Sequence, residues 1–292
     1  MVRTHTTGAF MKFGIIPVNI GVHRPEQMVA TAQQAEALGF ESAWTFEHVI
    51  VPIDYDSKYP YNPSGKMGAT PETNFVDPLI ALTVVAANTK TLRLGTGVNI
   101  LSQTNPLLMA KQVASIDFVS GGRMMLGVGI GWLREEFEAM GTPFEKRGAR
   151  FDDYVQAMRK VWSGETVEHD SEFLSWHGFK SYPVPVQKPF PVIMGGNKGK
   201  IFERTALYGD GWFAPSGSPG ELRAHLAELR KTCESVGRRY EDLEITCMWP
   251  GMGGADAVRA LRDAGVHRVV TFAAALGPDG MKKISDEVIG KV

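Results

Sequence analysis

The sequence predicts a single (β/α)8 barrel, in which eight parallel strands close into a cylinder surrounded by helices. Eight short apolar segments alternate with segments whose apolar residues follow the 3.6-residue period of a helix. Such alternation indicates a parallel sheet with helical cover, because parallel neighbours need a right-handed crossover. The length of 292 residues suits a barrel with insertions, since the fold typically takes about 250 residues. An open doubly wound sheet is the alternative, and the count of eight strands favours the barrel.

The expected strands are apolar segments, most of them with β-branched residues. They cover residues 12–18, 42–46, 92–98, 123–128, 191–194, 211–213, 243–248 and 268–272. The expected helices cover residues 25–38, 77–88, 105–119, 132–140, 148–162, 198–208, 219–236, 254–264 and 278–289. Two segments lengthen the pattern, a long one at 49–76 and an excursion of short strands at 167–185. We therefore predict insertions after strand 2 and after helix 4.

Composition describes an ordinary globular chain. Hydrophobic residues make up 43% and charged residues 22%, with a formal net charge of -1. The chain has no excess of positive charge that would favour binding to nucleic acid or to an acidic membrane surface, and a small-molecule partner fits better. The sequence has no run of 18 apolar residues and no signal-peptide pattern, and Cys233 and Cys247 lack metal-ligand or paired spacing. We expect a cytoplasmic protein with two reduced thiols.

The domain organisation follows from the same patterns. No internal repeat, low-complexity tract or flexible linker divides the chain. We expect residues 1–10 to be disordered or extended, with Met11 a candidate natural start, and residues 11–292 to form one barrel domain.

The candidate catalytic residues are Glu47 and His48, which follow the second expected strand. Working residues of a barrel lie at the carboxyl ends of its strands. A histidine here exchanges a proton near neutral pH, and the adjacent carboxylate either holds the tautomer of the ring or faces away. A histidine that merely bonds a neighbouring backbone group is an equally good interpretation. Residues 49–76, with four prolines and four tyrosine or phenylalanine residues, are expected to form a lid over the barrel mouth.

Three further strand ends are rich in glycine. Gly95 and Gly97, in the third strand before Val98 and Asn99, indicate either a flat group lying against the backbone or simple barrel curvature. The fourth strand runs through a GxGxG sequence at 127–131 toward a helix, a turn that suits an anionic phosphate. The fifth ends at 195–200, GGNKGK, a second phosphate cradle but not a P-loop, because its spacing is one residue short.

Sequence motifs for other chemistries are absent. The chain has no HExxH, no paired-cysteine cluster, no GxSxG and no set of carboxylates at metal spacing. The interpretation that remains is an enzyme whose chemistry comes from a bound organic cofactor.

Taken together, these motifs resemble the luciferase-like monooxygenase superfamily, and within it the branch that uses the deazaflavin F420. The resemblance extends from residue 12 to about residue 217. The segments that carry it are LRLGTGV at 92–98, NPLLMAKQ at 105–112, SGGR at 120–123, LGVGIGW at 126–132, EEF at 135–137, RGAR at 147–150 and PVIMGG at 191–196.

The resemblance implies a barrel that binds F420, or alternatively FMN, at its carboxyl-terminal mouth. It implies that Glu47 and His48 lie beside the deazaflavin ring and that His48 handles a proton. It also implies a non-prolyl cis peptide at a bulge resembling Gly97 and Val98, behind the ring. Cofactor contacts are implied for Gly97, Val98, Asn99, Gly129, Ile130, Gly131, Trp132, Gly195, Gly196 and Asn197, with no metal.

One departure from the family pattern bears on the substrate. Members that oxidise sugar phosphates carry a glutamate where this chain has Trp132, so that activity is disfavoured. The implied reaction is hydride transfer between reduced deazaflavin and an unsaturated or carbonyl substrate, with His48 as the proton donor. The aromatic residues of the expected lid and Trp132 suggest that this substrate is small and apolar or flat. The alternatives are an FMN-dependent monooxygenase that uses molecular oxygen and a non-catalytic cofactor-binding homologue. A homodimer is the expected assembly.

Overall fold

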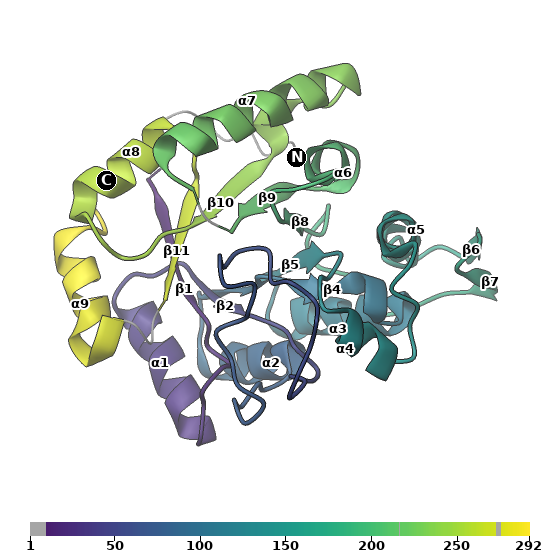
Figure 1. Ribbon diagram of the computed structural model, residues 1–292, viewed down its shortest axis with the longest axis horizontal. Helices are drawn as coiled ribbons and strands as arrows, with labels where there is room; N and C mark the ends of the chain where they lie inside the picture. Colours follow the sequence, from purple (N-terminus) through teal and green to yellow (C-terminus); the bar gives the residue numbers. More distant parts are fainter. Residues whose placement is uncertain (1–9, 216, 273–275) are drawn as a thin grey trace.

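The chain folds into a closed parallel barrel, described here in a computed structural model for residues 10–215, 217–272 and 276–292 (Figure 1). The strands of the barrel are β1 (Lys12–Ile16), β2 (Ser42–Thr45), β3 (Arg93–Thr96), β4 (Asn99–Ile100), β5 (Met124–Gly129), β8 (Val192–Gly195), β9 (Gly211–Ala214), β10 (Glu244–Met248) and β11 (Arg268–Phe272). Their order is β3-β2-β1-β11-β10-β9-β8-β5, and pairing of β3 with β5 closes the circle. Every neighbouring pair in the barrel is parallel. The predicted (β/α)8 fold is confirmed.

The third barrel strand consists of two pieces. β3 pairs with β5 through Leu94 and Gly95, whereas β4 pairs with it further along, where Asn99 faces Val128. The break between the pieces contains a cis peptide bond between Gly97 and Val98. Eight strands were expected, and the described residues contain eight barrel positions with this one interrupted.

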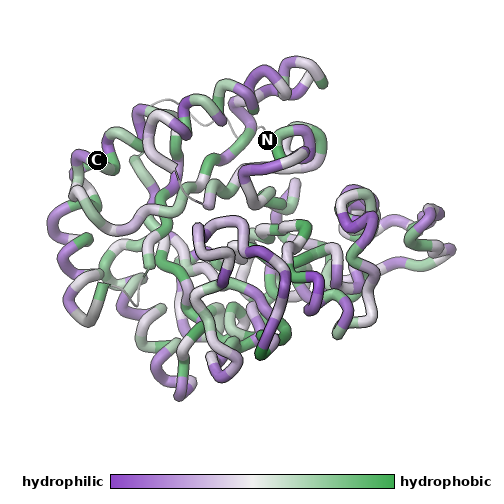
Figure 2. Tube along the Cα trace, in the orientation of Figure 1, coloured by the Kyte–Doolittle hydropathy of each residue, from purple (hydrophilic) through white to green (hydrophobic). Residues whose placement is uncertain are grey.

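Helices surround the barrel in Figure 1. They are α1 (Pro25–Ala37), α2 (Pro78–Asn88), α3 (Pro106–Val119), α5 (Arg147–Val161), α6 (Ile201–Tyr208), α7 (Pro219–Ser235), α8 (Gly254–Asp263) and α9 (Gly277–Glu287), with short 3-10 turns η1 (Leu101–Gln103) and η2 (Tyr240–Asp242). Figure 2 shows hydrophobic and hydrophilic residues alternating along outer helices such as α7, the pattern of helices buried on one face. No described helix is long and apolar enough to cross a membrane.

Local sequence signals explain where several helices begin. The Asp77 carboxylate accepts hydrogen bonds from the Leu79 and Ile80 amides at the start of α2, and Asn105 caps α3 in the same way. Ser218 and Glu221 form a capping box at the start of α7. Each of these helices also has proline in its first turn, where the missing N–H costs nothing.

Two insertions depart from the barrel at the predicted places. The first connects β2 to α2, and the second follows the short helix α4 (Arg134–Ala139). The second contains α5 and then the antiparallel hairpin of β6 (Val167–Asp170) and β7 (Ser175–Phe179), which projects away from the barrel in Figure 1. The expected segment 1–10 lies, apart from Phe10, outside the described residues.

The interior of the barrel is packed with side chains and is not a pore. Its core cluster consists of Ile16, Trp44, Met125, Ile193, Phe213 and Val270. The rings of Trp44 and Phe213 lie 5.3 Å apart between centroids. A Cβ atom on Gly95 would lie 2.4 Å from the Trp44 ring, so glycine is needed there to admit the indole. Space for a ligand is therefore left to the carboxyl ends of the strands.

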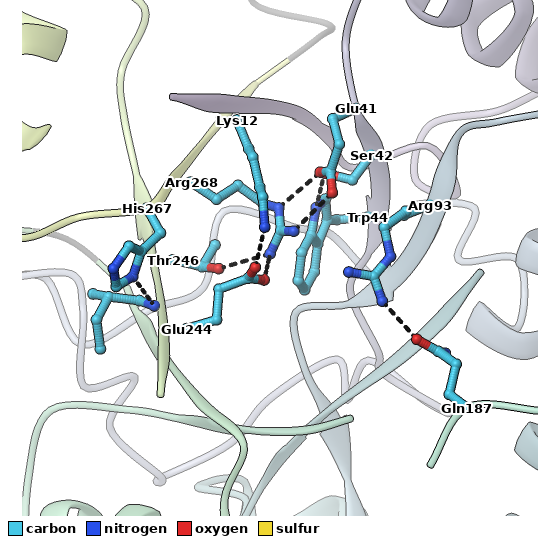
Figure 3. A network of polar contacts seen from close by, with 11 residues as sticks. Lys12, Glu41, Ser42, Trp44, Arg93, Gln187, Glu244, Thr246, His267 and Arg268 are labelled. Atoms are coloured by element: carbon cyan, nitrogen blue, oxygen red, sulfur yellow. Dashed lines mark hydrogen bonds and ion pairs between the residues drawn. The ribbon is translucent and has the colours of Figure 1, made fainter. Parts of the chain in front are cut away.

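A buried ion network closes the amino-terminal end of the barrel (Figure 3). The Arg268 guanidinium, which is fully buried, bonds the carboxylates of Glu41 and Glu244, and Lys12 also pairs with Glu244. Burial alone would raise the pKa of Glu244, but the charges of Arg268 and Lys12 hold that pKa well below its usual range. Because this end is closed by matched charges, it serves stability. Cys233 and Cys247 are buried free thiols elsewhere in the fold.

Candidate functional site

The predicted site residues come from strands that end at the same mouth, because the strands are parallel. The Gly97 amide donates a 2.7 Å hydrogen bond to the Thr45 carbonyl, which places the break between β3 and β4 beside the end of β2. The segment 46–77 that follows β2 runs across the front of the barrel in Figure 1. His48, the Gly97–Val98 peptide and this lid segment thus meet at one end of the molecule.

His48 is held on three sides. Its Nδ1 atom lies 3.0 Å from Oε2 of Glu136, and its ring packs edge-on against Phe75 and Trp132, at centroid distances of 5.7 and 5.9 Å. The side chain keeps 12% exposure. Among the described residues none bonds Nε2, so this nitrogen is the one available to a bound molecule. The histidine is thus neither turned into the helical shell nor used to cap a backbone group.

Glu136, which the sequence analysis did not single out as a functional residue, is the partner of His48. It lies in the first turn of α4, is 1% exposed, and also accepts hydrogen bonds from the amides of Val49 at 2.6 Å and Ile50 at 3.4 Å. The sequence contained a signal for it, since Glu135 and Glu136 are adjacent carboxylates at the start of a helix that follows a glycine-rich strand end. The contact itself joins residues 88 positions apart.

Glu47 faces away from His48. Its carboxylate accepts hydrogen bonds from the Asn99 side chain, at 2.5 Å, and from the Ile100 amide. Burial, with a smaller contribution from the nearby charge of Glu136, raises the pKa of Glu47 to about 7 against the opposing effect of these two bonds. The sequence left two roles open for the carboxylate next to His48, either to hold the tautomer of the ring or to face away from it. In the structure the Glu47 carboxylate faces away. Glu47 ties the end of β2 to β4, and its expected catalytic role remains a prediction.

The glycines of β5 and β8 surround the side chain of Val98. A Cβ atom would lie 2.8 Å from a Val98 methyl if built on Gly129, and 2.4 Å from one if built on Gly195. A Cβ on Gly127 would meet both the Thr96 carbonyl, at 1.8 Å, and Val98. These glycines, predicted to cradle phosphate, therefore also have a packing reason. Val98 joins three strand ends into one surface at the mouth.

The β5–α4 connection packs against the lid. Gly131 has a left-handed φ of 78° and would clash with Phe137 if it carried a side chain, while the neighbouring Ile130 packs against the main core. Trp132 contacts the rings of Tyr55 and Tyr59 at 5.8 and 5.1 Å, in addition to His48. Trp132 therefore connects the lid to His48 and to the end of β5.

A second carboxylate of α4 fixes the middle of the lid. Glu135 accepts hydrogen bonds from the amides of Asp56 and Ser57, at 2.8 and 3.2 Å. The Arg134 amide donates to the Ser57 hydroxyl at 3.0 Å. With two acidic residues in its first turn and only six residues in all, α4 does not suit an anionic ligand.

The β8–α6 loop suits an anion better. Gly196 has a φ of 127°, and α6 begins after Lys200 without a side-chain cap, so backbone amides of this turn are left to face a ligand. The Oδ1 atom of Asn197, buried with no partner among the described residues, could only accept a hydrogen bond and would suit a donor group. The cations in or near this loop, which we call the basic rim, are Arg147, Lys198, Lys200 and Arg204, of which Lys200 pairs with Glu203 and Arg204 with Asp152. A Cβ on Gly148, next to Arg147, would lie 2.8 Å from the Arg204 guanidinium, which shows how closely α5 and α6 approach.

Comparison with known proteins identifies relatives of the whole chain. The family model described as luciferase-like monooxygenase matches residues 6–283. An uncharacterised protein of Mycobacterium tuberculosis is 31% identical over 276 residues, which cover 90% of this chain and 95% of that protein. A second uncharacterised protein of M. tuberculosis is 32% identical over 184 residues, or 63% of this chain and 65% of that protein.

Solved structures share the fold at low sequence identity. The F420-dependent tetrahydromethanopterin reductase of Methanopyrus kandleri aligns with a TM-score of 0.73 and 18% identity, over 96% of this chain and 99% of that one. An F420-dependent secondary alcohol dehydrogenase, in complex with an F420-acetone adduct, aligns at 0.76 and 16%, over 97% and 98%. A monooxygenase of Streptomyces bottropensis aligns at 0.72 and 21%, over 95% and 98%.

Proposed function

Because the chain belongs to the luciferase-like monooxygenase family, we propose that it is an F420-dependent oxidoreductase that transfers hydride to or from a small, apolar or flat organic substrate. The observation that carries the proposal is the state of His48. Its ring is immobilised through Nδ1 and two aromatic neighbours, while Nε2 is left without a partner among the described residues. A proton donor or acceptor in a redox site needs this arrangement.

The mouth also fits a flat, anionic cofactor. The surface on which a planar ring would lie is formed by the Val98 side chain, which is packed over Gly129 and Gly195. Arg147 and Lys198, the two members of the basic rim without an ion pair among the described residues, and the uncapped start of α6 supply positive charge for a phosphate-bearing tail. The orphaned Oδ1 of Asn197 is a ready acceptor for a polar group of the same ligand.

The bound deazaflavin would supply or accept the hydride, and the residues of this chain would orient the substrate and move the proton. His48 would exchange a proton at Nε2 with the substrate atom next to the one that gains or loses the hydride, such as the oxygen of a carbonyl or hydroxyl group. Trp132 and the lid tyrosines would exclude water from that atom and present an apolar surface to the substrate. Trp132 stands where sugar-phosphate dehydrogenases of the family have a glutamate, which supports an apolar substrate over a sugar phosphate.

Direct binding measurements test the choice of cofactor. The purified full-length chain is titrated with F420 and with FMN while the fluorescence of each is followed. We expect F420 to bind with a Kd in the micromolar range or below and FMN at least about tenfold more weakly, a difference of about 1.4 kcal/mol. Tighter binding of FMN would instead favour the alternative of a monooxygenase that uses molecular oxygen; one structural neighbour is a monooxygenase. Failure of both to bind would overturn the proposal.

Replacement of His48 separates an enzyme from a non-catalytic homologue. In His48→Ala we expect F420 affinity within a few-fold of the original chain and a loss of turnover of roughly 10²- to 10⁴-fold, the usual contribution of a general acid or base. The screen uses reduced and oxidised F420 with small ketones, alcohols and unsaturated carbonyl compounds. Unchanged turnover of every accepted substrate would assign the chemistry to another residue, whereas an F420-binding chain that turns over no substrate would support a binding role alone.

A further inference from the structure

We infer that Glu136 is the positioning residue of His48: its carboxylate holds the proton of the neutral imidazole on Nδ1 and joins the ring to the first residues of the lid. The structural part stands on the hydrogen bonds around Glu136. The functional part, which gives the free Nε2 a proton to move, rests on the proposed function.

The geometry brings three donors to one carboxylate. Oε2 of Glu136 faces Nδ1 of His48 at 3.0 Å, and Oε1 accepts from the Val49 amide at 2.6 Å, with the Ile50 amide more distant at 3.4 Å. The Glu136 side chain is 2% exposed. Water therefore does little to satisfy this carboxylate, and its charge is stabilised by these donors.

The direction of the hydrogen bond follows from the chemistry of the two groups. An ionised carboxylate only accepts hydrogen bonds, so the imidazole must donate from Nδ1. In the neutral ring Nε2 then carries the lone pair and acts as an acceptor or base. When the ring gains a second proton, Nε2 becomes a donor and the positive charge lies against Glu136. The same carboxylate thus stabilises the neutral ring, in which Nε2 accepts a proton, and the protonated ring, in which Nε2 donates one.

The same carboxylate connects the ring to the lid. Val49 and Ile50 are the first residues beyond His48, and Phe75, near the other end of the lid, packs on the imidazole from the side. A movement of the lid that broke the Val49 bond would alter the charge balance at Glu136 and with it the orientation of His48. The residue next to it, Glu135, bonds only the middle of the lid and provides a matched control.

Nitrogen NMR of the cofactor-free, full-length chain tests the tautomer directly. With histidine labelled in both ring nitrogens, the signal of His48 is assigned by its loss in His48→Ala. At a pH where the ring is neutral, we expect Nδ1 to be protonated and Nε2 to show the shift of an unprotonated nitrogen. A His48 signal that shows mainly the Nε2–H form would overturn the inference, and this measurement requires no substitution at Glu136.

The variant Glu136→Gln should invert the tautomer. The amide oxygen replaces Oε1 as acceptor of the Val49 bond, which leaves the NH₂ group facing Nδ1 of His48. Nδ1 must then accept, and the proton should move to Nε2. Glu135→Gln, an isosteric change one residue away, should leave the His48 signal as it is. An unaltered tautomer in Glu136→Gln, with the fold verified by its thermal transition, would contradict the inference.

Steady-state kinetics then test whether the tautomer matters for function. For any substrate turned over by the F420-loaded chain, Glu136→Gln should lower kcat by at least about tenfold while KM changes by less than about threefold. Nε2 can then no longer accept a proton from an alcohol, and in the reverse direction it donates only from a neutral ring, which is a far weaker acid than an imidazolium. If the tautomer inverts but kcat does not fall, Glu136 positions His48 without a role in catalysis, and the proposed function of His48 fails instead. The inference about the tautomer and the proposed function of His48 can therefore fail independently of each other.

Discussion

A Cβ atom on Gly195 would lie 2.4 Å from Cγ1 of Val98, although the two residues come from different barrel strands. Val98 follows the cis peptide that separates β3 from β4, and its side chain lies against β5 and β8. The surface proposed to support the cofactor ring thus depends on a valine seated among glycines. Its packing can be tested without any ligand.

Gly195→Ala should destabilise the protein by about 1–3 kcal/mol, the usual result of adding a methyl group to a packed site. The added methyl group must displace the Val98 side chain, because this short, branched side chain cannot swing aside as the end of a long flexible one could. Thermal or denaturant unfolding measures the change. Gly68→Ala, where a Cβ meets nothing within 4 Å, is the control and should be nearly neutral.

A double variant identifies Val98 as the cause. If the clash is with Val98, then adding Val98→Ala to Gly195→Ala should cost less than Val98→Ala costs in the original chain, so that the two changes compensate. Simple additivity of the two unfolding free energies would assign the effect to another neighbour.

Glu47 should make stability depend on pH in an identifiable window. Its pKa is raised from an ordinary value of 4.5 to about 7 by burial, so the folded state holds the proton more tightly than the unfolded state does. The associated stability is fully present below about pH 4.5 and is lost as the pH rises through about 7. Its size is at most on the order of 3 kcal/mol.

Comparison with Glu47→Gln isolates this contribution. The introduced amide can donate to the buried Oδ1 of Asn99, which has no partner among the described residues, after that side chain flips. The unfolding free energy of the original chain minus that of the variant should therefore fall between pH 4.5 and 8. A difference that stays constant over this range would show that Glu47 does not titrate there.

Much of the fold, but less of the site, follows from the sequence. The eight strands and the helix starts are local properties, set by apolar periodicity and by caps such as Asp77 and Ser218. The site depends on contacts between distant residues. The bond between His48 and Glu136 spans 88 positions, and neither residue carries a local sign of the other. Glu47 and His48 were named together as candidates because they are adjacent in sequence, but adjacent residues at a strand end point in different directions.

Glycine patterns mislead for the same physical reason. A glycine shows that space is needed near the backbone, and it does not show what fills that space. For Gly95 the occupant is the Trp44 ring, and for Gly129 and Gly195 it is Val98. Only a three-dimensional arrangement distinguishes such packing from a ligand.

Arg268 should be essential to the stability of the amino-terminal end of the barrel. In Arg268→Met the carboxylates of Glu41 and Glu244 lose their shared guanidinium, and removal of one partner from a buried pair typically costs about 3–5 kcal/mol. Part of this loss should be recovered toward pH 4, where the two carboxylates gain protons. Unfolding measured at pH 7 and pH 4 tests both statements.

An exposed ion pair provides the contrast for Arg268. Lys282 bonds Asp286 at 2.6 Å on the surface of α9, with both side chains more than half exposed. Lys282→Ala should change the unfolding free energy by less than about 1 kcal/mol. Equal effects of the two substitutions would contradict the role assigned to the buried network.

Trp132 should control how firmly the lid is closed. Its ring contacts His48, Tyr55 and Tyr59, and these aromatic contacts are each worth about 0.5–1.5 kcal/mol beyond the area they bury. In Trp132→Ala the lid should open more often, which exposes the bonds after Lys58 and Lys66 to trypsin. We expect cleavage there to become faster by roughly tenfold, since proteolysis follows the population of the open form.

The hairpin provides a matched control for the lid. Trp176 on β7 contacts His169 and Phe179, outside the mouth, so Trp176→Ala should leave cleavage of the lid unchanged. Mass spectrometry of the early fragments identifies the cleaved bonds. If F420 lies beneath the closed lid, saturating cofactor should also slow cleavage in the original chain and do so less in Trp132→Ala. If the lid were cleaved at the same rate in Trp132→Ala and in Trp176→Ala, the contacts of Trp132 would have no specific role in holding the lid closed.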